Sequence, residues 1–178
     1  MKRTFPSLFT VGATNTAQPL VGTLLTANVS SGGSVPVSIP VASSAIFRVN
    51  DRVEIGIGSS VAEITFVNTI PDSTHITAII KNAHNNVANN NSIALHQAIA
   101  GLYVQPSAGD SGILYLGNNI AMSNNSYLVK ALTNVAANVQ PYDWNDDEQG
   151  SGINPLNTRE YWAYGTANDT YNVVLTII

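Results

Sequence analysis

The chain has 178 residues, of which 44% are hydrophobic and only 10% are charged, and it carries a net charge of −4. Soluble domains average roughly 25% charged residues, so uncharged polar side chains must cover much of this surface. The seven Lys and Arg residues form no basic cluster, and nucleic acid is therefore not an expected partner. The absence of cysteine excludes disulfides, thiolate nucleophiles and cysteine-based metal sites.

No stretch approaches the roughly 18 consecutive apolar residues of a membrane span, and the first residues lack the apolar core of a signal peptide. We therefore expect no membrane partner and no secretion signal.

Residues 1–19 predict an extended N-terminal arm. Phe5, Leu8 and Phe9 are apolar, but prolines, a glycine and a polar run interrupt any regular element around them. Two interpretations are open. The arm is either a disordered tail or a segment that becomes ordered only in an assembled particle, where these three side chains contact a neighbouring chain.

Residues 20–98 predict a barrel-like lobe of antiparallel strands. Within 47–57 the odd-numbered residues other than Asp51 are apolar, which is the period of a strand with one buried face. A second strand is expected over 61–67, and the turn residues 71–74 lead into a third that begins at Ile76. The prolines of segment 35–41 place that segment at a sheet edge.

Residues 99–178 predict a second lobe, similar to a β-sandwich or jelly roll. Segments 101–105 and 113–117 read as a hairpin with a glycine-rich loop, and 171–178 is a strongly apolar closing strand. No helical pattern of useful length is present. The expected class is all-β, with two small antiparallel lobes that meet near Ala98.

A catalytic serine can be drawn but is rejected. The run Gly109-Asp110-Ser111-Gly112, with His84 upstream, matches the short sequence around the nucleophile of chymotrypsin-like proteases. The match ends there, because Ile113 and Leu114 follow where that family continues with Gly and Pro. Turn chemistry alone explains the four residues, and no catalytic residue is expected.

Two metal sites are also weighed. Asp143, Asn145 and Asp147 have the oxygen spacing of a calcium loop, but Glu148 stands where the required glycine belongs and Asn154 where the bidentate Glu belongs. A calcium or magnesium site of another kind is an alternative, but a solvated acidic loop, or one that docks onto Arg or Lys of a partner, is the preferred interpretation. A zinc site would need three histidines, far apart in sequence, to converge in space. No metal or cofactor is therefore expected. The three are His75, His84 and His96.

An aromatic cluster offers a last candidate. Tyr161, Trp162 and Tyr164, with Trp144, could line a sugar-binding groove. We favour a role in the core and in a subunit interface, where aromatic rings are common. Tyr161, Trp162 and Tyr164 are the expected contacts of a homo-oligomer.

Two stretches of the first lobe, 41–53 and 70–77, resemble a small β module that recurs in structural proteins of tailed bacteriophages. The second lobe is similar in style to phage head decoration, fibre and minor virion proteins at 102–104, 113–117, 154–157 and 161–166. The resemblance covers most of residues 41–178.

The resemblance implies a virion component without enzymatic activity. The preferred expectation is a capsid decoration, or cement, protein that binds the major capsid protein on the outer surface and stabilises the shell, and that assembles as a homo-oligomer, most simply a trimer. One alternative is a tail or fibre component that recognises a host glycan. An alternative of another class is a small hydrolase that uses the acidic loop.

Overall fold

The computed structural model describes residues 3–12, 16–87, 92–107, 112–117, 128–133, 142–145 and 161–177. These residues contain strands and turns but no helix, which confirms the all-β class. The chain divides into two compact units. Unit 1 consists of Met1–Ala17 and Gln97–Ile178, and unit 2 is the contiguous segment Gln18–His96. The second boundary lies close to the expected Ala98, but the first residues belong to unit 1 rather than to a separate arm.

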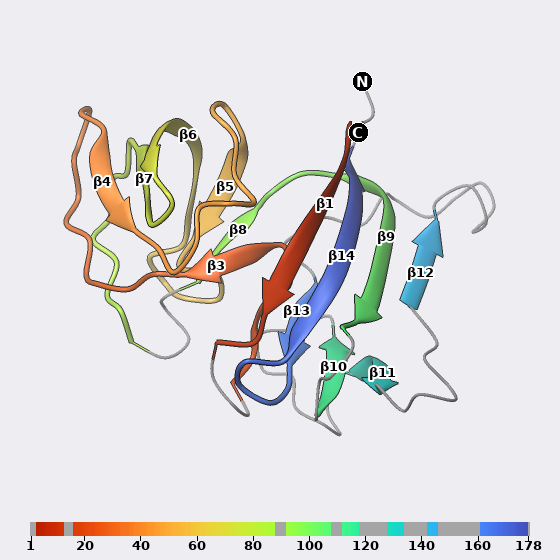
Figure 1. Ribbon diagram of the computed structural model, residues 1–178. Helices are drawn as coiled ribbons and strands as arrows, with labels where there is room; N and C mark the ends of the chain where they lie inside the picture. Colours follow the sequence, from red (N-terminus) through yellow and green to blue (C-terminus); the bar gives the residue numbers. More distant parts are fainter. Residues whose placement is uncertain are drawn as a thin grey trace. The chain divides into compact units, whose positions relative to one another are not determined.

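Unit 2 begins with the short strand β2 (Gln18–Pro19), and its main feature is a six-stranded antiparallel sheet. The strand order is β3-β8-β5-β6-β7-β4 (Figure 1). The bounds are β3 (Gly22–Leu24), β4 (Val37–Pro40), β5 (Arg52–Ile55), β6 (Glu63–Asp72), β7 (His75–Ala78) and β8 (Ser92–Leu95).

The two edges of this sheet meet. Leu25 forms a bridge with Val41, the N–H of Thr26 donates to the carbonyl of Pro40 at 3.0 Å, and the N–H of Ala42 donates to the carbonyl of Leu24 at 2.9 Å. The sheet therefore curls back on itself and leaves no long open edge, as in a barrel.

The interior of unit 2 is apolar. Strands β6 and β7 bury every second residue along part of their length, as period-2 patterning requires. Its fully buried side chains include Ile39, Val41, Phe47, Val53, Ile55, Val67, Ile76, Ile80, Ile93 and Leu95.

The expected strand at 47–57 is shorter than predicted. Phe47 is buried, but the segment around it is a turn and the strand begins only at Arg52. Asn50 adopts a φ of 70°, and the Asp51 carboxylate accepts a 2.7 Å hydrogen bond from the N–H of Arg48. These local bonds fold the chain back on itself before the strand begins.

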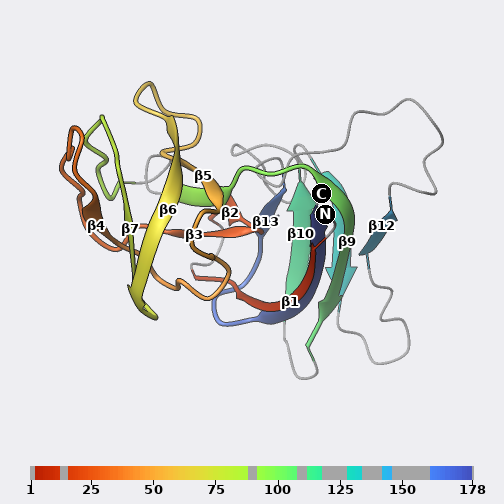
Figure 2. The ribbon, with the colours of Figure 1, turned by 90° about the horizontal axis from the view of Figure 1, so that it is seen from above.

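Unit 1 contains two sheets. The first has the order β1-β14-β9-β12, formed by β1 (Arg3–Thr10), β9 (Ile99–Pro106), β12 (Tyr142–Asn145) and β14 (Thr170–Ile177). In the second, β10 (Ile113–Gly117) pairs with both β11 (Leu128–Thr133) and β13 (Trp162–Tyr164). Figure 1 draws the second sheet behind the first, and Figure 2 shows the same strands from above.

The first strand of unit 1 corrects the prediction for the N-terminus. β1 pairs with β14 along its whole length, from Arg3 opposite Ile177 to Thr10 opposite Thr170. An arm that orders only on a neighbouring chain is therefore wrong for residues 3–10. The physical reason is that the apolar strand β14 needs a hydrogen-bonding partner on that side, and β1 supplies it within the same chain. Pro6 fits this position because β1 is an edge strand.

Candidate functional site

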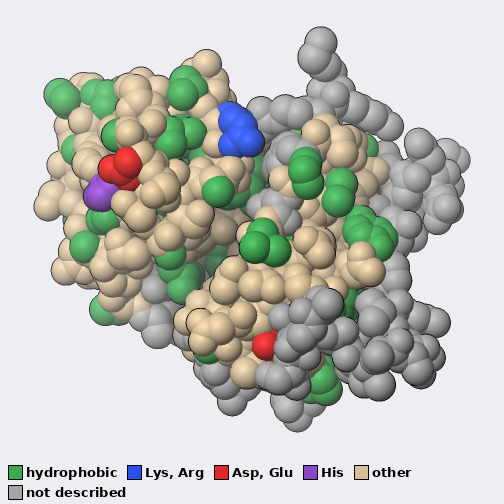
Figure 3. Space-filling view, in the orientation of Figure 1, with side chains coloured by type: hydrophobic (Ala, Val, Ile, Leu, Met, Phe, Trp, Pro, Cys, Tyr) green, Lys and Arg blue, Asp and Glu red, His purple; other side chains and the backbone are tan. Residues whose placement is uncertain are grey.

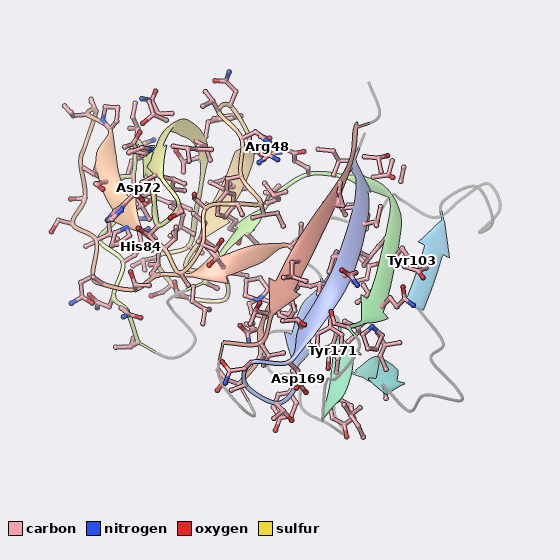
Figure 4. All side chains as sticks on the ribbon, in the orientation of Figure 1. Arg48, Asp72, His84, Tyr103, Asp169 and Tyr171 are labelled. Atoms are coloured by element: carbon pink, nitrogen blue, oxygen red, sulfur yellow. The ribbon has the colours of Figure 1, made fainter. Side chains whose placement is uncertain are left out.

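All three histidines of the sequence lie in unit 2, and each faces its own carboxylate. The pairs are His75 with Asp72 at 3.0 Å, His84 with Glu63 at 2.9 Å and His96 with Glu54 at 3.0 Å. Figure 4 labels Asp72 and His84, which belong to two different pairs. Among the described residues, no group of three or more His, Asp or Glu side chains could hold a metal ion.

Glu63 lies at the centre of one of these networks. Its carboxylate accepts backbone hydrogen bonds from Lys81 and Asn82, both at 2.9 Å, and one from Nε2–H of His84. Burial raises the pKa of Glu63, but the bonds from Lys81, Asn82 and His84 outweigh it and hold that pKa below its ordinary value. The ionised carboxylate thus fastens the segment after β7 to the start of β6.

The other ring nitrogen of His84 faces a confined space. Within the described part of the chain, Nδ1 of His84 has no hydrogen-bond partner, and the side chain is fully buried. A Cβ atom on Gly56 would lie 2.8 Å from this Nδ1 and 3.1 Å from Oγ of Ser59. A hydroxyl, an imidazole and a carboxylate are the three groups of a catalytic triad, in which the imidazole acts as the general base.

The burial of His84 argues against catalysis by these three groups. A general base must come within hydrogen-bond reach of the substrate proton, and the ring of His84 has no exposed surface. We therefore assign the network a structural role, in which it holds the segment after β7 against the start of β6. Sequence reasoning missed it because Glu63 and His84 are 21 residues apart.

The hairpin between β6 and β7 carries the second network. The Asp72 carboxylate accepts bonds from the backbone N–H of Thr74 at 2.7 Å and from Nδ1 of His75 at 3.0 Å, and it also binds the Thr74 hydroxyl. These bonds lower the pKa of Asp72 to about 2, and the bond from the Thr74 N–H contributes most. The pairing of Asp72 with a backbone N–H two residues later is the turn chemistry expected from the sequence.

Of the protease-like run 109–112, the structure describes only Gly112. The N–H of Gly112 donates to the buried Asp169 carboxylate at 2.8 Å, and a Cβ atom there would collide with Asp169 and Thr166. Figure 4 shows Asp169 near one end of β14. This contact ties the β9–β10 connection to the turn before β14, while residues 109–111 lie outside the described residues.

The acidic segment is described over its first part. Asp143 and Asn145 belong to β12, where they pair with Tyr103 and Gly101 of β9. Residues 146–148 and Asn154 lie outside the described residues, so the calcium and docking interpretations stay predictions.

The expected partner contacts separate into buried and exposed side chains. Phe9, Tyr161 and Trp162 are buried in the chain, and Tyr164 is half-buried with an edge-on contact to Tyr115. Leu8 is 62% exposed. Only the backbone of Phe5 is described, within β1, and the same holds for Trp144 in β12. Of the five whose burial is described, Leu8 alone is left on an open surface.

Among the described residues, the largest regular set of exposed apolar side chains lies instead on the outer face of unit 2. Ile64 and Phe66 alternate on β6 with buried Thr65 and Val67, and they are 44% and 58% exposed. Ile79 follows β7 and is 42% exposed. Val67 pairs with Ala78, so Phe66 and Ile79, the next residues along the two strands, lie opposite each other. We call Ile64, Phe66 and Ile79 the β6 face.

Two unpaired cations border the β6 face. Arg52 pairs directly with Phe66 across the sheet, and the backbone N–H of Lys81 bonds Glu63, the neighbour of Ile64. Both side chains are exposed, and within the described parts of the chain neither forms a hydrogen bond or an ion pair.

The carboxylates of unit 2 are, by contrast, all engaged within the chain. The four are Asp51, Glu54, Glu63 and Asp72. Elsewhere the surface is sparsely charged, as Figure 3 shows for one side of the molecule.

Comparisons with protein-family models, with curated proteins and with solved structures find no match. Among the described residues, no helix is long and apolar enough to cross a lipid bilayer.

Proposed function

We propose that this chain is a structural protein that works by adhering to other protein surfaces, and that it is a capsid decoration protein of a tailed bacteriophage. The observation that supports adhesion best is the β6 face. Its three side chains point away from a barrel interior that already has an apolar core, so folding of unit 2 does not require them to be apolar. Exposed apolar sets of this kind, bordered by charge, are typical of protein-binding surfaces.

A non-enzymatic role is supported by the use of the ionisable side chains. Glu63 and Asp72 organise backbone turns, and His84 is buried behind Glu63. Each of these groups stabilises the fold of unit 2, and we propose a part in a reaction for none of them.

The choice of a capsid decoration protein rests on the sequence resemblance to phage virion proteins. In this role the protein binds the major capsid protein on the outside of the shell, in contact with further copies of itself. A cysteine-free β protein with few charges suits side-by-side packing, because interface cores are depleted in charged residues.

The test is the copy number of the chain in virions that carry its gene. Purified particles are stripped with mild denaturant, and the released chain is quantified against the major capsid protein by mass spectrometry. A near-stoichiometric ratio is expected. A handful of copies would move the protein to the connector or tail, and absence from the particle would overturn the proposal.

A further inference from the structure

We infer that the exposed face of the β1-β14-β9 sheet in unit 1 binds a neutral oligosaccharide. The site uses none of the residues of the β6 face, and the inference does not rest on the proposed role in a capsid.

Three neighbouring strands present every second side chain on this face. Buried and accessible residues alternate along β14 (Thr170–Ile177) and, on β9, over 101–105. On β1, Leu8 is exposed and the next residue, Phe9, is buried. The accessible residues of the three strands therefore share one face, because side chains of a strand alternate between the two sides of its sheet.

The strand register arranges these side chains in rows across the sheet, and the middle row is apolar. Pro6 lies opposite Val174, and Val174 lies opposite Tyr103. Figure 4 labels Tyr103 on β9. The row extends about 10 Å from the first strand to the third, which is comparable to the length of a disaccharide. Aromatic and aliphatic side chains of this kind pack against the C–H faces of sugar rings.

A row of hydroxyl groups borders the apolar row on one side. Thr4 lies opposite Thr176, and their Oγ1 atoms are 2.8 Å apart. Thr176 in turn lies opposite Gly101, which has no side chain to occupy the position beside Tyr103 on this face. A threonine hydroxyl has one hydrogen to donate and two lone pairs, so the bonded pair retains capacity for a ligand.

A row of amides borders the apolar row on the other side. Asn172 is exposed and lies opposite Gln105. The hydroxyl of Tyr103 donates to Oε1 of Gln105 at 3.2 Å, which holds the ring beside the amide. Amides offer both donors and acceptors, as the hydroxyls of a sugar do. A sugar on the apolar row thus has groups of the required kind on both sides.

The charge of the face selects a neutral ligand. None of the side chains that the structure describes on this face is charged. An anionic ligand would lose hydration here without gaining a cation as compensation. A protein partner fits less well, because protein interfaces depend on anchors that become fully desolvated, whereas polar rows lie on both sides of this apolar row.

A titration of the full chain tests the site. The probes are maltohexaose, cellohexaose and chitohexaose, with a trimer of sialic acid as the charged control. In two-dimensional proton–nitrogen NMR spectra we expect saturable shifts of amide signals in β1, β14 and β9 with at least one neutral probe, and none with the control. No saturable shift with any neutral probe, shifts confined to other strands, or an equal response to the control would overturn the inference.

Matched variants identify the contacts. Tyr103→Ser should weaken binding of the responding sugar about tenfold, whereas Tyr103→Phe, which keeps the ring, should stay within about threefold of the wild type. Asn172→Ala changes an exposed side chain, so it should keep the fold and weaken binding about threefold or more. Phe66→Ser, on the β6 face, is the control and should bind as the wild type does. Unchanged affinity in Tyr103→Ser or in Asn172→Ala would overturn the inference.

Discussion

At the scale of single residues, Gly56 of unit 2 combines two constraints that favour glycine. Its φ of 68° favours glycine, and a Cβ atom would approach Nδ1 of the buried His84 to 2.8 Å. We predict that Gly56→Ala lowers the free energy of unfolding by about 2–3 kcal/mol, combining backbone strain with displacement of the ring.

Gly33 provides the matched control for this prediction. Its φ of 63° carries the same backbone penalty, but a Cβ atom there has open space around it. Gly33→Ala should cost only about 1 kcal/mol in the same urea titration. Equal losses for the two variants would show that the contact with His84 does not matter.

The lowered pKa of Glu63 predicts how the stability of the fold changes at acidic pH. Its pKa in the folded chain lies below the ordinary value of 4.5, so its contribution is present above that value and is lost as the pH falls through the folded pKa. Glu63→Gln keeps one acceptor oxygen but cannot serve all three donors, and we expect a loss of about 1–3 kcal/mol at neutral pH. The difference in unfolding free energy between wild type and variant should shrink as the pH falls below 4.5. A difference that is constant from neutral pH to pH 3 would contradict this assignment.

The histidine pairs show which part of a site a single sequence can reveal. Asp72, Thr74 and His75 are neighbours, so the turn chemistry of Asp72 could be predicted from local spacing. The partners of His84 and His96 lie on strands 21 and 42 residues away. Such pairs depend on strand register, which the sequence pattern does not specify.

At the scale of elements, period-2 patterning predicted the strands that bury one face. It missed a strand whose place in the sheet depends on pairing with another strand. β14 buries alternating residues along its length and was predicted at 171–178. β1 carries Pro6 and an exposed Leu8, and its place in the sheet comes from its pairing with β14 rather than from its own pattern. The β6 face breaks the rule of polar residues outside, which is why we propose it as a binding surface.

The pairing of β1 with β14 predicts the effect of an N-terminal truncation. A chain that begins at Gln18 loses all eight residues of β1 together with the buried Phe9 and Val11. We expect β14 to lose its protection against hydrogen exchange and unit 1 to melt earlier or not fold, while unit 2 keeps its own transition.

The exposed Leu8 supplies the control for the truncation. Leu8→Ser removes an apolar side chain that is 62% exposed and should leave β14 protected. If the truncated chain retained full protection in residues 171–177, β1 would not be a necessary part of the unit 1 sheet.

At the scale of the whole molecule, unit 1 is assembled from both ends of the chain and unit 2 is inserted between them. No composition change marks this arrangement, because residues 1–17 and 97–178 share no pattern that separates them from Gln18–His96. The sequence therefore predicted two lobes and a boundary near Ala98, but treated the first residues as an arm.

The insertion leads to a prediction about independent folding. Gln18–His96 is contiguous and contains every strand of the six-stranded sheet, the Leu25–Val41 bridge that joins its edges and the Glu63 network. We expect this fragment to fold alone with one cooperative urea transition of about 3–5 kcal/mol, since its core is small and contains no cysteine for a disulfide. A fragment of residues 27–96 is the control, because it lacks β3 and Leu25 and so leaves β8 and β4 each with one open edge, and it should give no cooperative transition. Dispersed amide signals in the proton NMR spectrum of the longer fragment, and their absence in the shorter one, are the expected results. If the two fragments behaved alike, closure of the sheet through β3 would not be what stabilises unit 2.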